Sequence, residues 1–419
     1  MKPTNIRWKV ITLLFFATTI NYIERVNISV AMPQIAKEFH FSPIVVGNLF
    51  SAFFLSYALL QLPIGVIIDK ISTKLIYIYS VIIWGLCTLL MALANSFGFI
   101  YLLRFLLGIG EAPAFPAATK AAAKWIPRKS RGIATGLFTA GVNLGSAITL
   151  PLAAFIVAKW GWRMCFVITG LFAFIWLIIW LIYYRELDVN PRVNEAERVL
   201  IKEGTENIGN QKQKIPYLQL LKQKYAIGLF LGYSCQIYAM FIALTWLPTY
   251  LVTIRHMTMI KTGIYGVLPF IFGTIFAFIG GAFSDWWVKI TPNGRKYTMV
   301  LGLLIGMVVI FAGYAKSWQF AILFFTISHS GIMFSNGAAW GACSEMAPSE
   351  QVGSLAAIQN FGGNIGAFLS PIITGALVQI TGNFISALVV TGIITTIGAM
   401  FYLVFLPQSK TTEILNTKT

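Results

Sequence analysis

Long apolar runs separated by short polar segments occupy almost the whole chain. Each run has about 18 or more residues with few charges, the length that an α-helix needs to cross a bilayer. The pattern predicts an all-α membrane protein with twelve transmembrane helices. The expected spans are residues 10–32, 46–68, 75–94, 99–122, 132–157, 163–184, 225–250, 262–284, 298–315, 318–342, 352–378 and 384–406.

The pattern also repeats. The one long polar stretch, residues 185–224, contains VNEAERVLIKEG, which can form a short surface helix. Glycines and an asparagine of RGIATGLFTAGVNLG, before this stretch, recur at the same spacing in VGSLAAIQNFGGNIG after it, and GVIID at 65–69 is mirrored by GAFSD at 281–285. Such repeats are typical of secondary transporters. We expect two pseudo-symmetric six-helix bundles, residues 1–184 and 225–419, joined by a cytoplasmic loop at 185–224.

Basic residues indicate how the chain lies in the membrane. A net charge of +17 would by itself also suit a nucleic-acid-binding protein. Most of the 31 Lys and Arg residues, however, lie in alternate loops, and the loops between hold only Lys37, Lys159, Arg163, Arg255, Lys261 and Lys316. The positive-inside rule then places the basic loops and both termini in the cytoplasm. We therefore expect a lipid bilayer around the protein and no nucleic-acid partner.

The first apolar run is interpreted as a membrane helix and not as a signal peptide. Asn21, Glu24 and Arg25 interrupt it, and no small-residue cleavage pattern follows. The four cysteines lie in or at the ends of apolar stretches without CxxC spacing, which predicts packing residues and no metal site. Short loops, with no long glycosylatable loop after the first helix, favour a bacterial inner membrane.

Charged residues inside the spans mark the candidate site. Arg104 and Glu111 in the fourth span are seven residues apart, so they face nearly the same way, roughly 10 Å apart along the helix. A charge at membrane depth costs about 2.5–3.5 kcal/mol on insertion scales, so this face is expected to line a bundle interior or a watery cavity. Glu24 and Arg25 in the first span point about 100° apart, so one is expected to face the cavity and the other a neighbouring helix.

These residue types suggest roles. The planar guanidinium of Arg25 can hold a carboxylate with two hydrogen bonds and stays charged, which suits the anchor of an anionic substrate. Burial favours the protonated form of Glu111, which predicts a proton-transfer group. Arg104 can bind substrate or hold Glu111 ionised until substrate competes for it. A purely structural ion pair remains an alternative for Arg104 and Glu24.

Several motifs resemble those of a known family. Gly65-x-x-x-Asp69-Lys70-x-Ser72-x-Lys74 resembles the loop motif after the second helix in the major facilitator superfamily, with Ser72 where glycine is usual. Tyr22-x-Glu24-Arg25 and Arg104-x-x-x-Gly-x-x-Glu111 resemble the anion:cation symporter family, whose members transport hexuronates, aldonates or glucarate and include the sialin-like carriers. In the sugar-acid members the position of Glu24 is more often aspartate.

The resemblance extends over essentially the full length and implies further roles. It implies substrate contacts at Tyr22, Tyr57 and Asn360, although Tyr57 equally suits a packing position. Trp340 can stack on the face of a sugar, although aromatic residues in such a chain usually face lipid or the core. It also implies that Asp69 works as a gate, either capping a helix or pairing with a loop arginine such as Arg131. Asp285 is the repeat counterpart of Asp69 and is expected to act likewise.

We therefore expect a transporter that works as a monomer and needs no cofactor. No nucleotide-binding glycine loop, metal-ligand cluster or catalytic-triad spacing is visible, so an enzyme or an ATP-driven pump is not expected. The favoured function is proton-coupled uptake of a small organic anion, preferably a sugar acid such as a hexuronate, aldonate or glucarate, by alternating access. The alternatives are a drug or metabolite:proton antiporter, an organophosphate/anion exchanger and a receptor that binds without transport.

Overall fold

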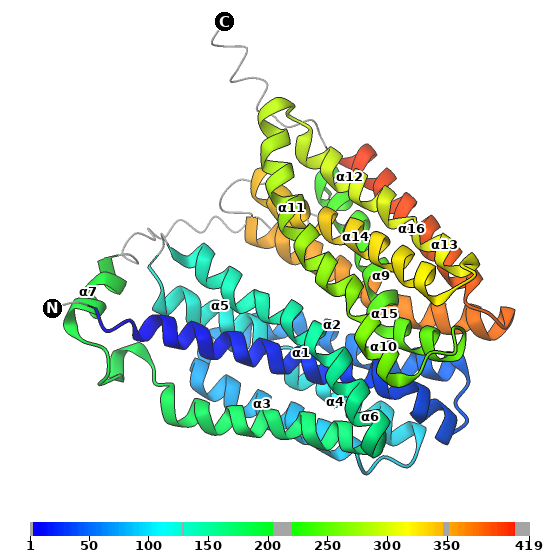
Figure 1. Ribbon diagram of the computed structural model, residues 1–419. Helices are drawn as coiled ribbons and strands as arrows, with labels where there is room; N and C mark the ends of the chain where they lie inside the picture. Colours follow the sequence, from blue (N-terminus) through cyan, green and yellow to red (C-terminus); the bar gives the residue numbers. More distant parts are fainter. Residues whose placement is uncertain (1–2, 128–129, 204–219, 221, 347–351, 407–419) are drawn as a thin grey trace, which may run out of the picture. The chain divides into compact units, whose positions relative to one another are not determined.

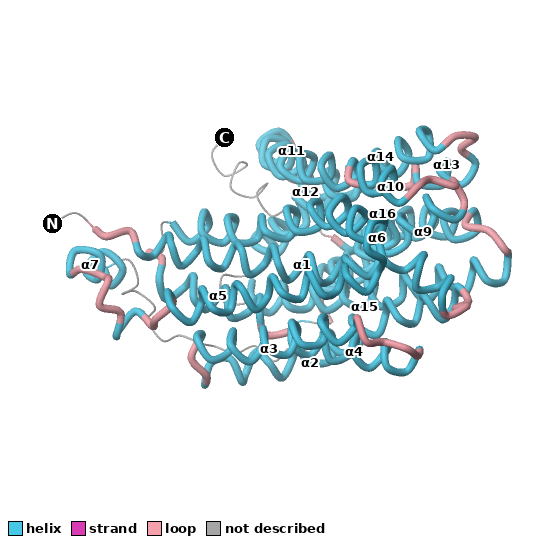
Figure 2. The backbone as a smooth tube through the Cα atoms, turned by 60° about the horizontal axis from the view of Figure 1, so that its bottom comes forward, coloured by secondary structure: helices cyan, strands magenta, loops and turns pink. Residues whose placement is uncertain are grey.

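The structure is a computed structural model, and it describes the chain except for residues 1–2, 128–129, 204–219, 221, 347–351 and 407–419. The described part is built of helices and contains no strand (Figure 2). In chain order (Figure 1) the elements are α1 (Ile6–Glu38), α2 (Pro43–Lys70), α3 (Thr73–Met91), α4 (Phe97–Glu111), α5 (Ala114–Trp125), α6 (Arg131–Tyr183), η2 (Leu187–Val189), α7 (Glu195–Glu203), α9 (Lys224–Thr253), α10 (Met259–Gly266), α11 (Leu268–Ile290), α12 (Gly294–Gly306), α13 (Val309–Tyr314), α14 (Trp318–Met346), α15 (Val352–Thr381) and α16 (Ile385–Phe405).

The helices account for twelve membrane spans, as the hydrophobic pattern predicts. Ten stretches of the described chain are long and apolar enough to cross a membrane. One of them, α6, has 53 residues and contains two spans. The twelfth is α1, whose mean hydropathy is lowered by Asn21, Glu24 and Arg25 in its middle. The prediction of an all-α membrane protein is thus confirmed.

Glycine and proline set the breaks within these spans. At Gly161 the backbone takes φ 83° and ψ 168°, a conformation that glycine adopts readily, and this single residue turns the first half of α6 into the second. The predicted single helix at 99–122 is interrupted after Glu111, because Pro113 has no backbone N–H to continue the helical ladder. Glu111 therefore ends α4, directly before the break.

The chain groups into two compact units. The first comprises Met1–Phe39 and Ala52–Gln211, and the second comprises His40–Ser51 and Lys212–Thr419. The start of α2 thus belongs to the second unit, where the hydroxyl of Ser51 donates to the carbonyl oxygen of Phe368 at 2.7 Å. The division into bundles at residues 1–184 and 225–419 stays a prediction.

The repeated glycines have the same role in both units. In the first unit a Cβ on Gly145 would lie 2.4 Å from the Thr19 carbonyl oxygen, so only glycine lets α6 approach α1 this closely. In the second unit a Cβ on Gly366 would lie 2.1 Å from the Ser234 carbonyl oxygen, so α15 approaches α9 in the same way. The sequence repeat therefore corresponds to a repeated helix-packing device.

The segment after α6 is bound to the first unit. The predicted surface helix is present as α7, and Glu197 on it is fully buried. Its carboxylate accepts hydrogen bonds from the hydroxyl of Thr4 and the backbone N–H groups of Ile6 and Arg7, and it pairs with the Arg7 guanidinium at 3.0 Å. Glu197 thereby supplies the acceptors that the first turn of α1 lacks.

Acid is expected to release α7 from α1. Burial by itself raises the pKa of Glu197, but the hydrogen bonds from Thr4, Arg7 and Ile6 outweigh it and lower that pKa below its usual value. A carboxylate that is more acidic in the folded protein stabilises it at neutral pH and loses this contribution as the pH falls through the lowered pKa. Glu197→Gln should speed hydrogen exchange in the first turn of α1 already at neutral pH. The exposed neighbour Glu195→Gln should not, and equal protection in both variants would contradict this role.

Candidate functional site

The charged residues singled out from the sequence are buried in the first unit. Arg25 and Glu24 come from α1, and Arg104 and Glu111 come from α4. Their exposed fractions are 9% for Arg25, 1% for Glu24, 3% for Arg104 and 1% for Glu111. Charges this deeply buried need specific partners, because desolvation of each one is costly.

Arg25 and Glu111 form the central ion pair. Both Nε and Nη2 of Arg25 donate to the same oxygen, Oε2 of Glu111, at 3.0 and 2.7 Å. Oε1 of Glu111 is buried without a hydrogen-bond partner. Nη1 of Arg25 donates to the hydroxyl of Tyr22 at 3.3 Å. The guanidinium is therefore held in one plane, while its carboxylate partner keeps one oxygen unsatisfied.

Aromatic rings enclose the guanidinium of Arg25. Its carbon lies 4.5 Å from the ring centroid of Tyr22, 4.6 Å from that of Phe53 and 5.0 Å from that of Tyr57. Contacts of a cation with ring faces at this range are attractive and leave the N–H groups free to donate in the guanidinium plane. The predicted positions Tyr22 and Tyr57 thus lie beside Arg25.

A small cavity opens on this cluster. Its volume is about 30 Å³, room for two or three water molecules at about 10–15 Å³ each. Its polar lining comes from Asn21, Tyr22, Arg25, Tyr57 and Glu111. The side-chain nitrogen of Asn21 is buried there without a partner. The cavity therefore offers unsatisfied donors and acceptors to a polar ligand.

Glu24 faces away from this cavity, in line with the 100° turn between neighbouring residues. Its Oε2 accepts a hydrogen bond from the Thr88 hydroxyl of α3 at 2.5 Å, and its Oε1 is buried without a partner. Glu24 and Glu111 thus have different hydrogen-bond partners within the same unit.

Arg104 does not hold Glu111 by hydrogen bonds. Its guanidinium carbon lies 5.2 Å from the ring centroid of Phe53, and its Nε is buried without a partner. Helix spacing predicted correctly that Arg104 and Glu111 face the bundle interior. The direct hydrogen bonds to Glu111, however, come from Arg25.

The second unit contains a neutral polar cluster around Gln236 of α9. Oε1 of this fully buried residue accepts hydrogen bonds from the hydroxyls of Ser335 and Tyr402, at 2.9 and 3.2 Å. Its Nε2 donates to Oδ1 of Asn336 at 3.2 Å. Gln236 thus joins α9 to side chains of α14 and α16. The sequence analysis did not single out Ser335, Asn336 or Tyr402.

Two further residues of the second unit, Trp340 and Asn360, were predicted as substrate contacts. Trp340 is 46% exposed and meets the ring of Tyr233 edge-on, with centroids 6.0 Å apart. Asn360 is half-buried on α15. Oε1 of the neighbouring Gln359 accepts a hydrogen bond from the thiol of Cys343 at 3.1 Å. Their suggested roles toward substrate stay predictions.

The predicted gate residues differ in what they contact. Asp69 lies on α2, but its side chain is outside the described part of the structure. Arg131 donates to the carbonyl oxygens of Ile126 and Ala123, at 3.1 and 2.8 Å, so it closes the end of α5. Asp285 accepts from Nη2 of Arg295 at 2.8 Å.

Asp285 belongs to a cluster of three charged residues. The same Nη2 of Arg295 that binds Asp285 also contacts Glu345 on α14 at 2.6 Å. Arg295 at the start of α12 thus bridges the end of α11 to α14. The gating role of Asp285 stays a prediction.

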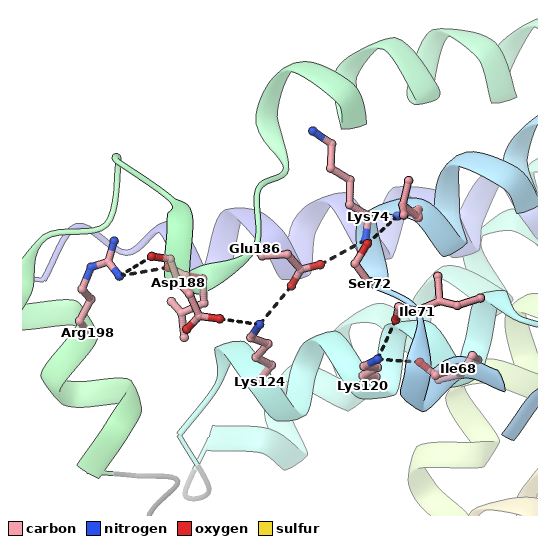
Figure 3. Close-up of polar contacts among 11 residues, drawn as sticks. Ile68, Ile71, Ser72, Lys74, Lys120, Lys124, Glu186, Asp188 and Arg198 are labelled. Atoms are coloured by element: carbon pink, nitrogen blue, oxygen red, sulfur yellow. Dashed lines mark hydrogen bonds and ion pairs between the residues drawn. The ribbon is translucent and has the colours of Figure 1, made fainter. Parts of the chain in front are cut away.

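Lysines and carboxylates join the helix ends of the first unit on the side of the long loop (Figure 3). Nζ of Lys120 donates to the carbonyl oxygens of Ile68 and Ile71, at 2.6 and 2.8 Å. Lys124 lies between Glu186 and Asp188, at 3.3 and 2.9 Å. The Lys124 ammonium, donating to Asp188, lowers the pKa of that carboxyl. These contacts tie α2, α5 and the segment after α6 together.

The comparisons with known proteins identify a multi-pass membrane transporter and not an enzyme. The chain matches the Major Facilitator Superfamily over residues 14–293 and 293–419, and it belongs to that superfamily. The resemblance to its anion:cation symporter family is likewise confirmed by full-length relatives.

Three relatives illustrate the similarity. The chain is 32% identical to the probable galactarate/D-glucarate transporter GudP of Escherichia coli (strain K12), across 99% of this chain and 96% of GudP. It is 28% identical to the D-galactonate transporter of Escherichia coli O6:H1 (strain CFT073), across 98% and 97% of the two chains. It is 30% identical to the probable sulfoacetate transporter SauU of Cupriavidus necator, across 93% and 91%.

A solved structure supports the fold. The bacterial homolog of the human lysosomal transporter Spinster, in its inward-facing and unoccupied conformation, matches with a TM-score of 0.79. The match covers 95% of this chain and 96% of that protein at 21% sequence identity. The likeness shows the shared fold alone.

Proposed function

We propose that this protein is a proton-coupled symporter that takes up a small organic anion, with sugar acids such as aldarates, aldonates or hexuronates as its substrates. The names of its relatives support this class, because galactarate, glucarate, galactonate and sulfoacetate are all organic anions. The observation that carries the proposal is the buried Arg25, which gives two N–H donors to a single oxygen of Glu111.

The ion pair suggests how proton and anion are coupled. A substrate carboxylate and Glu111 compete for the same Nε and Nη2 of Arg25. Protonation of Glu111 weakens its bond to Arg25 and frees the planar donor pair for substrate. Loss of substrate on the inner side lets Glu111 release its proton and return to Arg25. In this scheme an empty carrier with protonated Glu111 is disfavoured, because a buried arginine is then left unpaired.

Glu24 provides a second candidate proton site. Its carboxyl has Thr88 as a hydrogen-bond partner and retains an unsatisfied buried oxygen. A carboxyl in such surroundings binds a proton without competing for Arg25. We propose that Glu24 contributes to coupling and Arg104 to the positive potential that attracts the anion.

Neutral groups in each unit can recognise the hydroxyls of a sugar acid. In the first unit these groups are Tyr22 and Tyr57. In the second unit they are Asn360 and the Asn336 amide that Gln236 holds in place, with Trp340 offering an apolar face. A site that hydrogen-bonds a substrate hydroxyl discriminates against ligands that lack it.

The proposed operating cycle is alternating access in a bacterial inner membrane. We propose that both termini face the cytoplasm, that the protein acts as a monomer, and that Asp69, Arg131 and Asp285 take part in closing the cytoplasmic side. The excess of Lys and Arg in alternate loops supports this orientation.

Proton movement in proteoliposomes tests the proposal. The purified protein is reconstituted, and the pH inside the vesicles is followed after addition of galactarate, glucarate, galactonate, a hexuronate, sulfoacetate or a neutral sugar. We expect one or more of the acids to acidify the interior, and neutral sugars to have no effect. Anion exchange without proton entry would instead support the exchanger, and proton exit coupled to drug entry would support the antiporter.

A further inference from the structure

The first unit carries a second, separate groove on its outer surface. It lies between α1 and the second half of α6 and has a volume of about 720 Å³. No residue lines both this groove and the cavity at Arg25. Its apolar wall includes Leu13, Phe16 and Ile20 from α1 and Phe172, Ile175 and Ile179 from α6.

The groove has a firm floor and an open side. Trp176 is 3% exposed, and its indole N–H donates to the Leu13 carbonyl oxygen at 3.0 Å, which fixes α6 to α1. Phe16 and Ile175 on the walls are about half exposed, so the open side meets the apolar interior of the membrane. From Ile6 to Ile20 helix α1 rises about 21 Å at about 1.5 Å per residue. This rise exceeds the thickness that one leaflet contributes to the hydrocarbon core, about 15 Å.

Two cations lie at the end of the groove where α1 begins. Lys9 comes from α1, and Arg192 comes from the segment between η2 and α7. The guanidinium of Arg192 lies 5.2 Å from the ring centroid of Tyr183, another lining residue. Its backbone N–H donates to Oδ1 of Asn190 at 3.0 Å, which orders this position.

Two carboxylates near this end of the unit pair with other cations, whereas Glu195 is exposed. Glu197 pairs with Arg7, and Asp188 pairs with Lys124. Lys9 and Arg192 are exposed, and neither forms an ion pair with a carboxylate within the described part of the chain. The groove is thus apolar along its length and positively charged at one end.

We propose that this groove binds an anionic glycerophospholipid, with the phosphate headgroup at Lys9 and Arg192 and an acyl chain along α1 and α6. The match of two unpaired cations with an anionic headgroup selects a lipid rather than an apolar partner helix. A small soluble anion would leave the long apolar wall unused. Bound lipid would bridge α1 to the segment after α6, and the proposal is independent of the transported substrate.

The second unit provides an internal comparison. A groove of about 570 Å³ along α11, α12 and α14 is lined by apolar residues with Gln319, Thr326 and Ser330, and no charged residue lines it. A lipid in that groove would gain nothing from a negative headgroup. Selectivity for anionic lipid should therefore depend on the groove of the first unit.

Native mass spectrometry with defined lipids tests the proposal. The full-length protein is incubated with equal amounts of phosphatidylglycerol and phosphatidylcholine that carry identical acyl chains. Two cation contacts predict a preference of roughly tenfold to thirtyfold for the first phosphatidylglycerol bound. Lys9→Gln with Arg192→Gln should remove this preference. Lys37→Gln with Lys159→Gln, which lowers the net charge equally, should keep it.

A second pair of variants tests the apolar wall. The tryptophan of Ile175→Trp would project into the groove and should reduce the affinity for the tightest-bound lipid several-fold. Ile178→Trp, equally exposed on α6 but outside the groove, should leave that affinity unchanged. Equal affinity of the wild type for both lipids would overturn the proposal. So would retained selectivity in the Lys9/Arg192 double variant, or cross-linking of two chains through cysteines placed at Ile175.

Discussion

Replacing Arg25 by lysine is expected to reduce uptake of the preferred anion by about a hundredfold while the protein still folds. A lysine ammonium keeps the positive charge but cannot present two parallel donors, and it loses the flat stacking against Tyr22, Phe53 and Tyr57. Each hydrogen bond to a charged group contributes about 1.5–3 kcal/mol, so loss of one donor and of the stacking accounts for this magnitude. Uptake is measured in proteoliposomes at substrate concentrations below saturation.

Two matched variants make this result specific. Arg163→Lys changes an exposed arginine, paired with Glu38 at 2.7 Å, and should transport normally. Arg104→Lys distinguishes the roles of the two buried arginines. This variant should reduce uptake less than Arg25→Lys, because Arg104 donates no hydrogen bond to Glu111. Near-normal uptake by a folded Arg25→Lys protein would remove Arg25 from the binding site. A larger loss in Arg104→Lys would move the anchor to α4.

The hydrophobic pattern predicted the fold well, because span length and charge placement are local properties of the sequence. It could not predict how neighbouring spans join. One glycine, Gly161, replaces an expected loop, and Pro113 divides an expected single helix. It also could not reveal contacts between distant helices, such as the hydrogen bond from Ser51 to Phe368.

The candidate site was predictable only where it carries charge. Glu24, Arg25, Arg104 and Glu111 are conspicuous in apolar spans, because each is costly to bury. The sequence did not predict which of these residues pair. Arg25 and Glu111 are 86 positions apart, and helix spacing instead favoured Arg104 as the neighbour of Glu111.

Neutral polar residues give a weaker signal. Ser335, Asn336 and Tyr402 resemble many other polar residues of membrane helices, and only their convergence on Gln236 distinguishes them. Sequence spacing cannot reveal such a cluster, because its members come from α9, α14 and α16.

Replacing Glu111 by glutamine is expected to separate anion movement from proton movement. Glutamine imitates the protonated carboxyl, so it should leave the donors of Arg25 available to substrate at every pH. Exchange of labelled for unlabelled substrate should then persist at a rate within about tenfold of the wild type, since the lost bond is between protein groups and not to substrate. Accumulation against a gradient, driven by an acidic exterior, should be abolished.

The pH dependence gives the sharper test of this uncoupling. In the wild type, uptake should rise as the external pH falls, because protonation of Glu111 precedes binding of the anion to Arg25. In Glu111→Gln the exchange rate should become nearly independent of pH, whereas Glu38→Gln, an exposed carboxylate paired with Arg163, should behave as wild type. If Glu111→Gln still accumulates substrate, Glu111 does not carry the coupled proton. Repeating the measurement on Glu24→Gln would then show whether the proton is carried on α1, beside Thr88.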